Sequence, residues 1–200
     1  MRIHRDILTG LMCCLATKQA DQVIYRNLAI SADGKKMYAG NGHLLGIGDL
    51  IDCDMAVAGA IIDANDVAQY LRDIKRTRAI YVDFQVTWDT RDGKPALAAW
   101  VPMGIGEGKV HIGLLHNAPR FPDPTGLIEA SAPVISGENS RIAIGYKELA
   151  IIQKALKPFT FTYVYAPKAV NVPSWWMGKA SKDSELRIMV MPGHPGVWPA

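Results

Sequence analysis

The sequence Pro119-Arg120-Phe121-Pro122-Asp123-Pro124-Thr125-Gly126-Leu127 divides the chain into two parts. Its prolines fix the backbone angle φ and remove hydrogen-bond donors, so we expect neither a helix nor an interior strand to run through it. We interpret this stretch as a connector. Phe121 is bulkier and more apolar than a solvated linker requires, and we expect it to pack against the parts on either side. The alternative is a surface loop with one exposed aromatic side chain.

The composition is that of an ordinary globular protein. The 200 residues are 49% hydrophobic and 20% charged, and a net charge of +3 permits contact with nucleic acid without requiring it. Cys13, Cys14 and Cys53 lack the Cys-x-x-Cys spacing of a zinc site and are odd in number, so we expect reduced thiols in a cytoplasmic protein. We expect no bound metal, no cofactor, no signal peptide and no membrane span.

Residues 1–118 predict an α+β domain that opens with a helix. Apolar residues between Ile3 and Lys18 recur with the spacing of an amphipathic helix, and Arg2 and Arg5 project onto its opposite face. This polar face is either simply solvated or presents cations to the phosphate groups of DNA.

Strands dominate the rest of this first part. The turn Asp33-Gly34, between Val23–Ser31 and Lys36–Gly40, indicates a β-hairpin. A second helix is expected after Asp63, because the side chain of Asp63 or of Asn65 can cap its first turn. Three further strands complete a largely antiparallel sheet: Ile80–Trp88, Ala96–Pro102 and Lys109–Leu115.

The glycine-rich stretch Gly40–Gly48 invites comparison with phosphate-binding loops. It contains no Gly-Lys-Ser/Thr, and its glycines do not match the dinucleotide-binding fingerprint. We expect instead a turn with positive φ, followed by a strand that carries Leu45 and Ile47. His43 lies on that turn, either as a partly buried polar residue or as a catalytic base that would need a partner.

Residues 128–200 partly repeat the first part. They predict a strand, a helix and two further strands, without a counterpart of the opening helix and hairpin, so we expect a truncated internal repeat joined through a linker at residues 119–127. Residues Val170–Met177 have no clear assignment. The predicted elements are the strand Arg141–Gly145, the helix Tyr146–Leu156 and the strands Phe159–Tyr165 and Leu186–Met191.

In their order and spacing, three short motifs resemble the bacterial DNA polymerase III sliding clamp, the beta processivity subunit. The stretch from Asn41 to Leu45 resembles the family's Asp-Gly-His-x-Leu turn, Phe121-Pro122-Asp123 resembles its interdomain linker, and Met191-Pro192 resembles its Met-Pro terminus. The resemblance implies a DNA-clamp-like fold of antiparallel sheets, with two helices in the first domain and a truncated second copy. The shortened form suggests a phage or prophage origin.

The resemblance also implies a non-catalytic role in DNA replication. In the clamps, polymerases and repair proteins dock a short peptide in an apolar pocket between the turn, the linker and the C-terminal strand. The implied partners are therefore clamp-binding peptides, with double-stranded DNA, contacted by Arg2 and Arg5, and further copies of the chain as additional candidates. The alternative is that the pocket residues only join the two parts. The matching residues are Gly42, His43, Leu45, Pro122, Leu127, Met189 and Met191.

The chain also departs from the family pattern. A full bacterial clamp protomer has three domains, whereas the elements predicted for this chain correspond to about one and a half domains. The second part lacks the opening helix that lines the DNA hole in the family. Pro124-Thr125-Gly126 replaces the basic, aromatic segment that usually follows Phe-Pro-Asp.

Two other classes of protein remain open. A small hydrolase would use His43 with Cys53 or Asp49, although the sequence contains no Gly-x-Ser-x-Gly or His-Glu-x-x-His motif. A viral structural or assembly protein would use Trp175-Trp176 and Trp198 as an interface.

Overall fold

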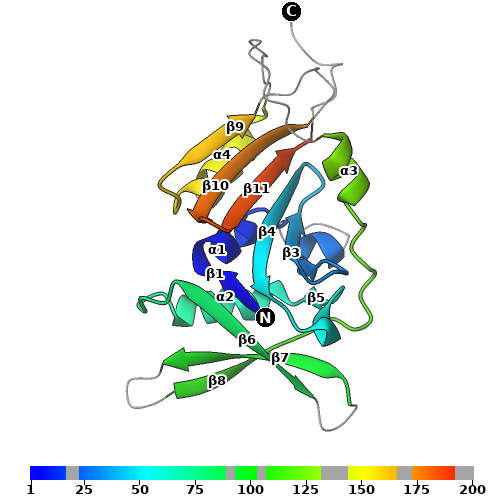
Figure 1. The fold of residues 1–200 in the computed structure, drawn as a ribbon, viewed down its shortest axis with the longest axis vertical. Coiled ribbons are helices and arrows are strands. Elements are labelled where there is room, and N and C mark those ends of the chain that lie inside the picture. The colour runs from blue at the N-terminus through cyan, green and yellow to red at the C-terminus, as the bar shows by residue number, and fades with distance from the viewer. Residues whose placement is uncertain (17–22, 89–92, 103–106, 132–143, 166–172, 192–200) are drawn as a thin grey trace, which may run out of the picture.

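The structure, a computed structural model, describes residues 1–16, 23–88, 93–102, 107–131, 144–165 and 173–191 (Figure 1). Its helices are α1 (Arg5–Cys13), α2 (Ala64–Asp73), α3 (Thr125–Ala130) and α4 (Tyr146–Leu156), with 3-10 turns η1 (Val23–Arg26) and η2 (Met55–Val57). Its strands are β1 (Arg2–His4), β2 (Leu28–Ile30), β3 (Lys36–Gly40), β4 (Leu44–Asp52), β5 (Ile61–Ile62), β6 (Tyr81–Trp88), β7 (Pro95–Pro102), β8 (Glu107–Ile112), β9 (Thr162–Tyr165), β10 (Ser174–Ser181) and β11 (Ser184–Val190).

The long strand β4 is the point at which the sheet branches. One edge of β4 pairs with β3, which continues through β2 to β5. On its other edge, the residues from Leu44 to Gly48 pair with β11, whereas Leu50 and Asp52 pair with β1. Two arms therefore leave β4, namely β11-β10-β9 and β1-β6-β7-β8, and all these pairings are antiparallel.

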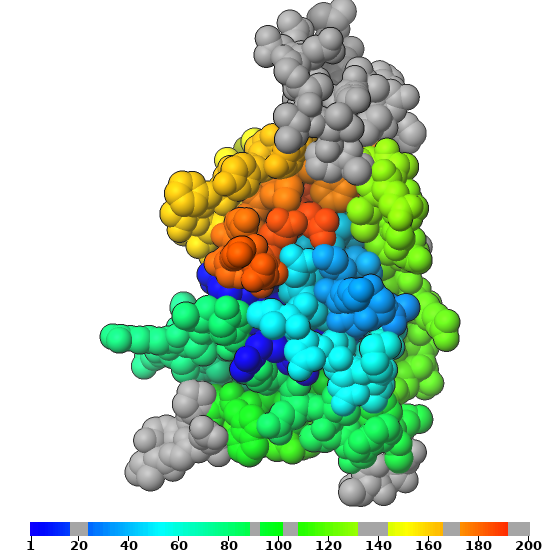
Figure 2. Space-filling model, viewed as in Figure 1, coloured from blue at the N-terminus to red at the C-terminus, as the bar shows by residue number. Residues whose placement is uncertain are grey.

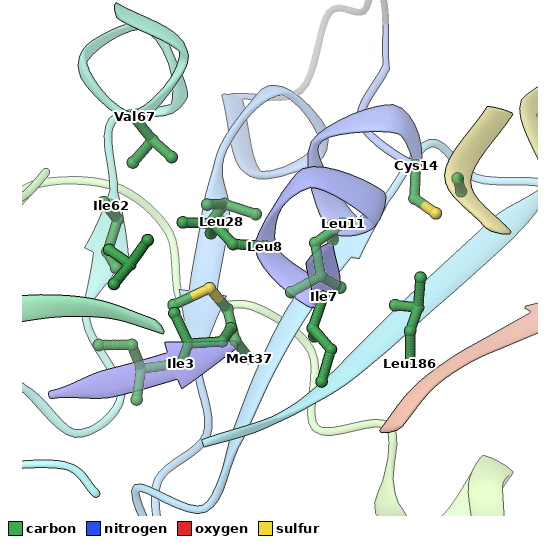
Figure 3. Packing of buried hydrophobic residues seen from close by; sticks show 14 of the residues in the cluster. Ile3, Ile7, Leu8, Leu11, Cys14, Leu28, Met37, Ile62, Val67 and Leu186 are labelled. Carbon is green, nitrogen blue, oxygen red and sulfur yellow. The ribbon is translucent and has the colours of Figure 1, made fainter. Parts of the chain in front are cut away.

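Helices α1, α2 and α4 share one hydrophobic core with one face of this branched sheet. They lie behind the strands in Figure 1, where α1 contacts both α2 and α4. Figure 3 shows Ile7 and Leu11 of α1 close to Leu186 of β11, and all three side chains are fully buried. The largest amphipathic elements thus bury their apolar sides together, as the predicted α+β class requires.

Two glycines of β4 allow α1 to lie close to the sheet. A Cβ atom at Gly48 would lie 2.5 Å from Ile7 Cγ2, and one at Gly46 would lie 3.0 Å from Cys14 Sγ. The glycine-rich stretch also contains the expected turn, in which Gly42 has a φ of 89°. Turn geometry and helix packing therefore explain these glycines without a phosphate ligand.

The opposite face of the sheet carries a second hydrophobic cluster, here called the outer cluster. Phe121 of the linker packs on it, and its ring stacks on that of Tyr38 with centroids 5.7 Å apart and an interplanar angle of 18°. The expectation that Phe121 packs is therefore confirmed. The buried members of the cluster are Ala29, Tyr38, Leu45, Ile47, Ile61, Trp175 and Met189, and Leu115, Ala118, Phe121, Ile128 and Tyr165 pack against them.

The opening helix is shorter than its apolar spacing predicted. It begins at Arg5, because Arg2–His4 form β1, which pairs with β4 and β6. The ring nitrogen Nδ1 of His4 accepts a hydrogen bond from the backbone N–H of Asp6 at 3.2 Å and caps the helix. Arg2 consequently lies on a strand, and its predicted place on the polar face of the helix was wrong.

A short helix begins inside the predicted connector, which was expected to contain none. Helix α3 begins at Thr125, directly after Pro124, and the Oδ1 atom of Asp123 accepts hydrogen bonds from the Thr125 N–H at 3.0 Å and hydroxyl at 2.6 Å. Proline is tolerated at a helix start because the first N–H groups have no partner within the helix. The proline pattern therefore marked where a helix starts.

Most other predicted elements are confirmed with shifted ends. The hairpin is formed by β2 and β3, although η1 replaces the first residues of its expected first strand. Asp63 caps α2 by accepting the N–H of Asn65 at 2.8 Å, and the helix Tyr146–Leu156 has the expected bounds. Of the strand expected at Arg141–Gly145, residues 141–143 lie outside the described residues, and 144–145 form no strand. None of the described helices is long and apolar enough to cross a membrane.

Candidate peptide groove at the β4–β11 seam

The pairing of β4 with β11 brings together the turn and the last described strand. Met189 lies opposite Leu45, and the backbone N–H of Met191 donates to the carbonyl of His43 at 2.9 Å. Two of the three segments expected to form the peptide pocket are thus hydrogen-bonded neighbours.

The turn itself is held by one side chain. The Oδ1 atom of Asn41 accepts hydrogen bonds from the N–H groups of His43 and Leu44, both at 2.9 Å. A carboxamide oxygen fills this role as well as a carboxylate oxygen does. The Asn for Asp replacement therefore leaves the geometry of the turn intact.

Helix α3 completes the seam from the linker side. The hydroxyl of Ser131 donates to the carbonyl of Leu127 at 2.6 Å and lies 3.3 Å from the Sδ atom of Met189. The indole N–H of Trp175 donates to the carbonyl of Ser131 at 2.5 Å. These contacts fix α3 beside β10 and β11. Sequence reasoning missed Ser131, for which no motif gave a signal. Of the residues that the alternative assembly protein would use as an interface, Trp175 is buried, and Trp198 lies outside the described residues.

The seven predicted groove residues differ in their exposure. Leu45 and Met189 are 8% and 0% exposed and belong to the outer cluster, so they form the base of the seam. Leu127 and Met191 are 40% and 36% exposed and present apolar side chains at its surface. Gly42 and His43 are exposed on the turn. Leu45 and Met189 are therefore buried, as the alternative interpretation expects, whereas Leu127 and Met191 carry exposed apolar side chains, here called the rim.

Pro122 lies on a different part of the linker. It lines a pocket of about 560 Å³ between the linker and the β2–β3 turn, together with Asp33, Tyr38 and Phe121. In Figure 2 the green linker and α3 border the face on which β3, β4 and β11 are visible. Pro122 lies in the linker before α3, whereas Leu127 lies within α3.

Arg2 and Arg5, the predicted DNA contacts, both have partners within the protein. Arg2 forms a bidentate ion pair with Asp83, with Nε–Oδ1 at 2.7 Å and Nη2–Oδ2 at 3.1 Å, and this pairing raises the pKa of Arg2. Arg5 donates to the carbonyls of Thr77 at 2.9 Å and Lys75 at 3.1 Å. Neither guanidinium is fully available to a phosphate.

An exposed basic segment follows α2 directly. Lys75, Arg76 and Arg78 are all exposed, and Arg78 lines a cleft of about 580 Å³ together with Arg5 and Lys179. Sequence reasoning did not single out this segment as a DNA contact. Its signal was the run Lys75-Arg76-Thr77-Arg78.

The structure does not assemble the hydrolase site that the sequence left open. His43 precedes β4, whereas Asp49 lies six residues further along this strand, a separation of about 20 Å in an extended chain. Asp49 forms ion pairs with Lys36 and with Arg187, and burial raises the pKa of Cys53. Within the described ranges, no three His, Cys, Asp or Glu side chains are grouped to hold a metal ion.

A branched antiparallel sheet with paired helices on one face defines a sliding-clamp-like architecture. Comparison with solved structures confirms it. The sliding clamp of Bacillus subtilis superposes with a TM-score of 0.53 at 12% sequence identity, covering 97% of this chain and 64% of that one. The PCNA2–PCNA3 complex of Sulfolobus tokodaii gives 0.55 at 8% identity, covering 96% of this chain and 99% of the matched chain.

A putative DNA polymerase III beta subunit from Eubacterium rectale gives a TM-score of 0.52 at 10% identity, covering 96% of this chain and 65% of that one. The chain therefore spans less than two thirds of the length of the two bacterial proteins. No protein-family model matches the sequence. A comparison with curated protein sequences finds no match either. At these identities the similarity establishes the fold, which is sliding-clamp-like.

Proposed function

We propose that this protein is a non-catalytic, sliding-clamp-like replication protein that binds peptide segments of replication or repair proteins at the β4–β11 seam. The observation that supports this best is that α3, the His43 turn and the end of β11 meet at the seam, where Ser131 lies against Met189 and the N–H of Met191 donates to the carbonyl of His43. Leu127 of α3 and Met191 both carry exposed apolar side chains. The sliding-clamp-like fold is a second support.

The chemistry of the rim suits leucine or phenylalanine anchors of a peptide. Leu127 offers a branched apolar surface, and the flexible thioether of Met191 can adapt to differently shaped partners. The seam itself is apolar and closely packed, because Met189 and Leu45 are buried in the outer cluster. Apolar grooves with few polar groups are typical sites for short peptide motifs.

A peptide titration tests this proposal. A fluorescent peptide of about ten residues with leucine and phenylalanine anchors is titrated with wild type, Met191→Asp and the control Met55→Asp, since Met55 is 65% exposed on η2. We expect Met191→Asp to weaken binding at least about tenfold, because a buried charge beside apolar anchors is costly. Equal binding by wild type and Met191→Asp would show that the seam is not the docking site.

We propose in addition that the basic segment after α2 contacts the phosphate groups of DNA. This assignment replaces the prediction for Arg2 and Arg5, whose guanidinium groups have internal partners. Lys75, Arg76 and Arg78 are exposed. They follow α2, which shares the hydrophobic core with α1 and α4. Such contacts would be independent of base sequence.

Closure around DNA would require further copies of the chain, and an exposed strand edge is available for pairing. Among the described strands, β9 pairs only with β10, and its neighbourhood exposes Phe161, Tyr163 and Val164. Apolar edge strands are sites of association. We propose a homo-oligomer through this edge. Light scattering at increasing protein concentration should show a mass above 21.9 kDa that returns to the monomer value in Val164→Lys; a wild-type monomer throughout contradicts it.

A further inference from the structure

The pocket beside Phe121, here called the linker pocket, has features that the peptide groove does not explain. One wall is the turn from Ile30 to Asp33, another is Ala58–Gly59, and the third is the linker from Arg120 to Thr125. Its volume is about 560 Å³, which is ample for one long side chain.

Two carboxylates are held in fixed positions at this pocket. The Oδ1 atom of Asp33 accepts from the Ser31 hydroxyl at 2.6 Å and from the Lys35 N–H at 3.0 Å. Asp123 accepts both of its hydrogen bonds, from Thr125, at Oδ1 as well. These hydrogen bonds lower the pKa of Asp33 and of Asp123. Each carboxylate therefore keeps its charge at neutral pH and leaves Oδ2 without a hydrogen-bond partner among the described residues.

A largely buried tyrosine brings a polar group to the pocket. Tyr38 lines the pocket and is only 7% exposed, and its hydroxyl forms no hydrogen bond within the described part of the chain but is not fully buried, so it is accessible to a ligand in the pocket. Burial raises the pKa of Tyr38, the negative charges of Asp33 and Asp123 raise it further, and the positive charge of Arg187 opposes them. The ring of Tyr38 stacks on Phe121. The pocket thus combines two anionic oxygens, one neutral oxygen and an aromatic pair.

We propose that the linker pocket binds an arginine side chain of the partner peptide. A guanidinium group is planar, donates five hydrogen bonds and stacks on aromatic rings, so it matches this set of groups better than an ammonium group does. Two cations of the chain lie near, Arg120 on the linker wall and Lys35 beside Asp33. Within the described residues neither forms an ion pair with Asp33 or Asp123, so both carboxylates remain available.

This inference rests on the proposed peptide-binding function, because the two sites are adjacent. Thr125 lines the pocket and begins α3, and Leu127 of the groove lies two residues further along the same helix. A peptide whose apolar anchors occupy the groove can therefore place an arginine across Pro122. The partner's motif would combine apolar anchors with one basic residue.

A small probe tests the pocket without the groove. N-acetyl-arginine amide is titrated into the full ¹⁵N-labelled chain, with the neutral isostere N-acetyl-citrulline amide as the reference. We expect arginine-specific shifts at the backbone amides of Asp33, Gly59 and Asp123. Asp33→Asn and Asp123→Asn should each weaken binding about threefold to tenfold. Asparagine keeps the Oδ1 acceptor, so the turns remain formed.

Asp183→Asn, on the exposed β10–β11 turn, is the matched control and should bind like wild type. Identical behaviour of the arginine and citrulline probes would overturn the proposal. So would wild-type binding by the Asp33→Asn/Asp123→Asn double variant.

A peptide pair then separates the two sites. The groove peptide is compared with a version that carries citrulline in place of arginine. Loss of the arginine advantage in the double aspartate variant, with binding still sensitive to Met191→Asp, supports both proposals. An arginine advantage that needs the aspartates but ignores Met191→Asp supports the pocket and contradicts the groove. Binding that depends on Met191 but shows no arginine advantage contradicts the pocket alone.

Discussion

Met189 lies directly opposite Leu45 in the β4–β11 pairing, although the two residues come from opposite sides of the linker. Met189 is fully buried and Leu45 nearly so. The seam is therefore part of the protein's core as well as the base of the candidate groove. Substitutions at the base and at the rim should have separable effects.

Met189→Ala should destabilise the fold, and Leu127→Ala should mainly weaken peptide binding. Truncating a fully buried methionine costs about 2–5 kcal/mol, because the cavity only partly collapses. Leu127 is 40% exposed, so its truncation should cost less than about 1 kcal/mol. Denaturant unfolding and peptide titration measure the two effects. A Leu127→Ala protein that binds normally would show that α3 does not line the groove.

Gly48→Ala should destabilise the packing of α1 on β4. The new methyl group would lie 2.5 Å from Ile7 Cγ2 and 2.9 Å from Leu11 Cδ1, and such overpacking costs about 1–3 kcal/mol. Gly126→Ala is the control, because it adds a methyl group to α3 with nothing within 4 Å. That control should be neutral or stabilising by up to about 1 kcal/mol, since alanine favours helix. Thermal unfolding of both variants measures these effects. Equal stability of Gly48→Ala and wild type would mean that α1 does not pack closely on β4.

Phe121→Ala should loosen the linker from the sheet. It removes the stack on Tyr38, and an aromatic pair contributes about 0.5–1.5 kcal/mol beyond the burial of its area. Peptide affinity should fall as well, because α3 follows the linker. Tyr146→Ala, at a side chain 87% exposed, should change stability by less than about 0.5 kcal/mol. Chemical unfolding of both variants measures this difference, and equal effects would mean that Phe121 does not anchor the linker.

Stability should decline on acidification because of His4. Burial lowers the pKa of His4 below its ordinary 6.5, and the nearby Asp6 carboxylate opposes this only in part. The folded state then binds fewer protons than the unfolded state, so the contribution is present above pH 6.5 and is lost as pH falls through the folded pKa. Protonation also removes the Nδ1 acceptor that caps α1.

His4→Asn is expected to keep a capping acceptor and to lose this part of the pH dependence. Unfolding midpoints measured from about pH 8 to about pH 5 compare the two proteins, because this range spans the ordinary histidine pKa. Parallel curves for wild type and His4→Asn would contradict the assignment to His4.

Replacing Lys75, Arg76 and Arg78 together by alanine should weaken DNA binding and flatten its salt dependence. Each lost phosphate contact reduces the slope of log affinity against log salt by about one. Lys182→Ala, on the exposed β10–β11 turn, removes a charge elsewhere and should leave the slope unchanged. Retention of wild-type protein on duplex DNA without any salt slope would leave only the protein-binding role.

The sequence by itself determined the local elements and their order. Short-range rules place the hairpin at Asp33-Gly34, the start of α2 near Asp63 and helix α4, because these depend on residues only a few positions apart. The motif order also indicated a clamp-like fold. Local patterns misplaced the start of α1, because Arg2–His4 pair with distant strands that spacing cannot reveal.

Only the tertiary structure decided which groove residues are exposed and which cations are free. Burial of Met189 and pairing of Arg2 with Asp83 both depend on strands that meet across long sequence separations. The linker pocket has the same origin, since Asp33 and Asp123 are distant in the sequence and line one pocket in the folded chain, where Phe121 stacks on Tyr38. Sequence patterns report local geometry, whereas these properties arise from packing between segments that are distant in the chain.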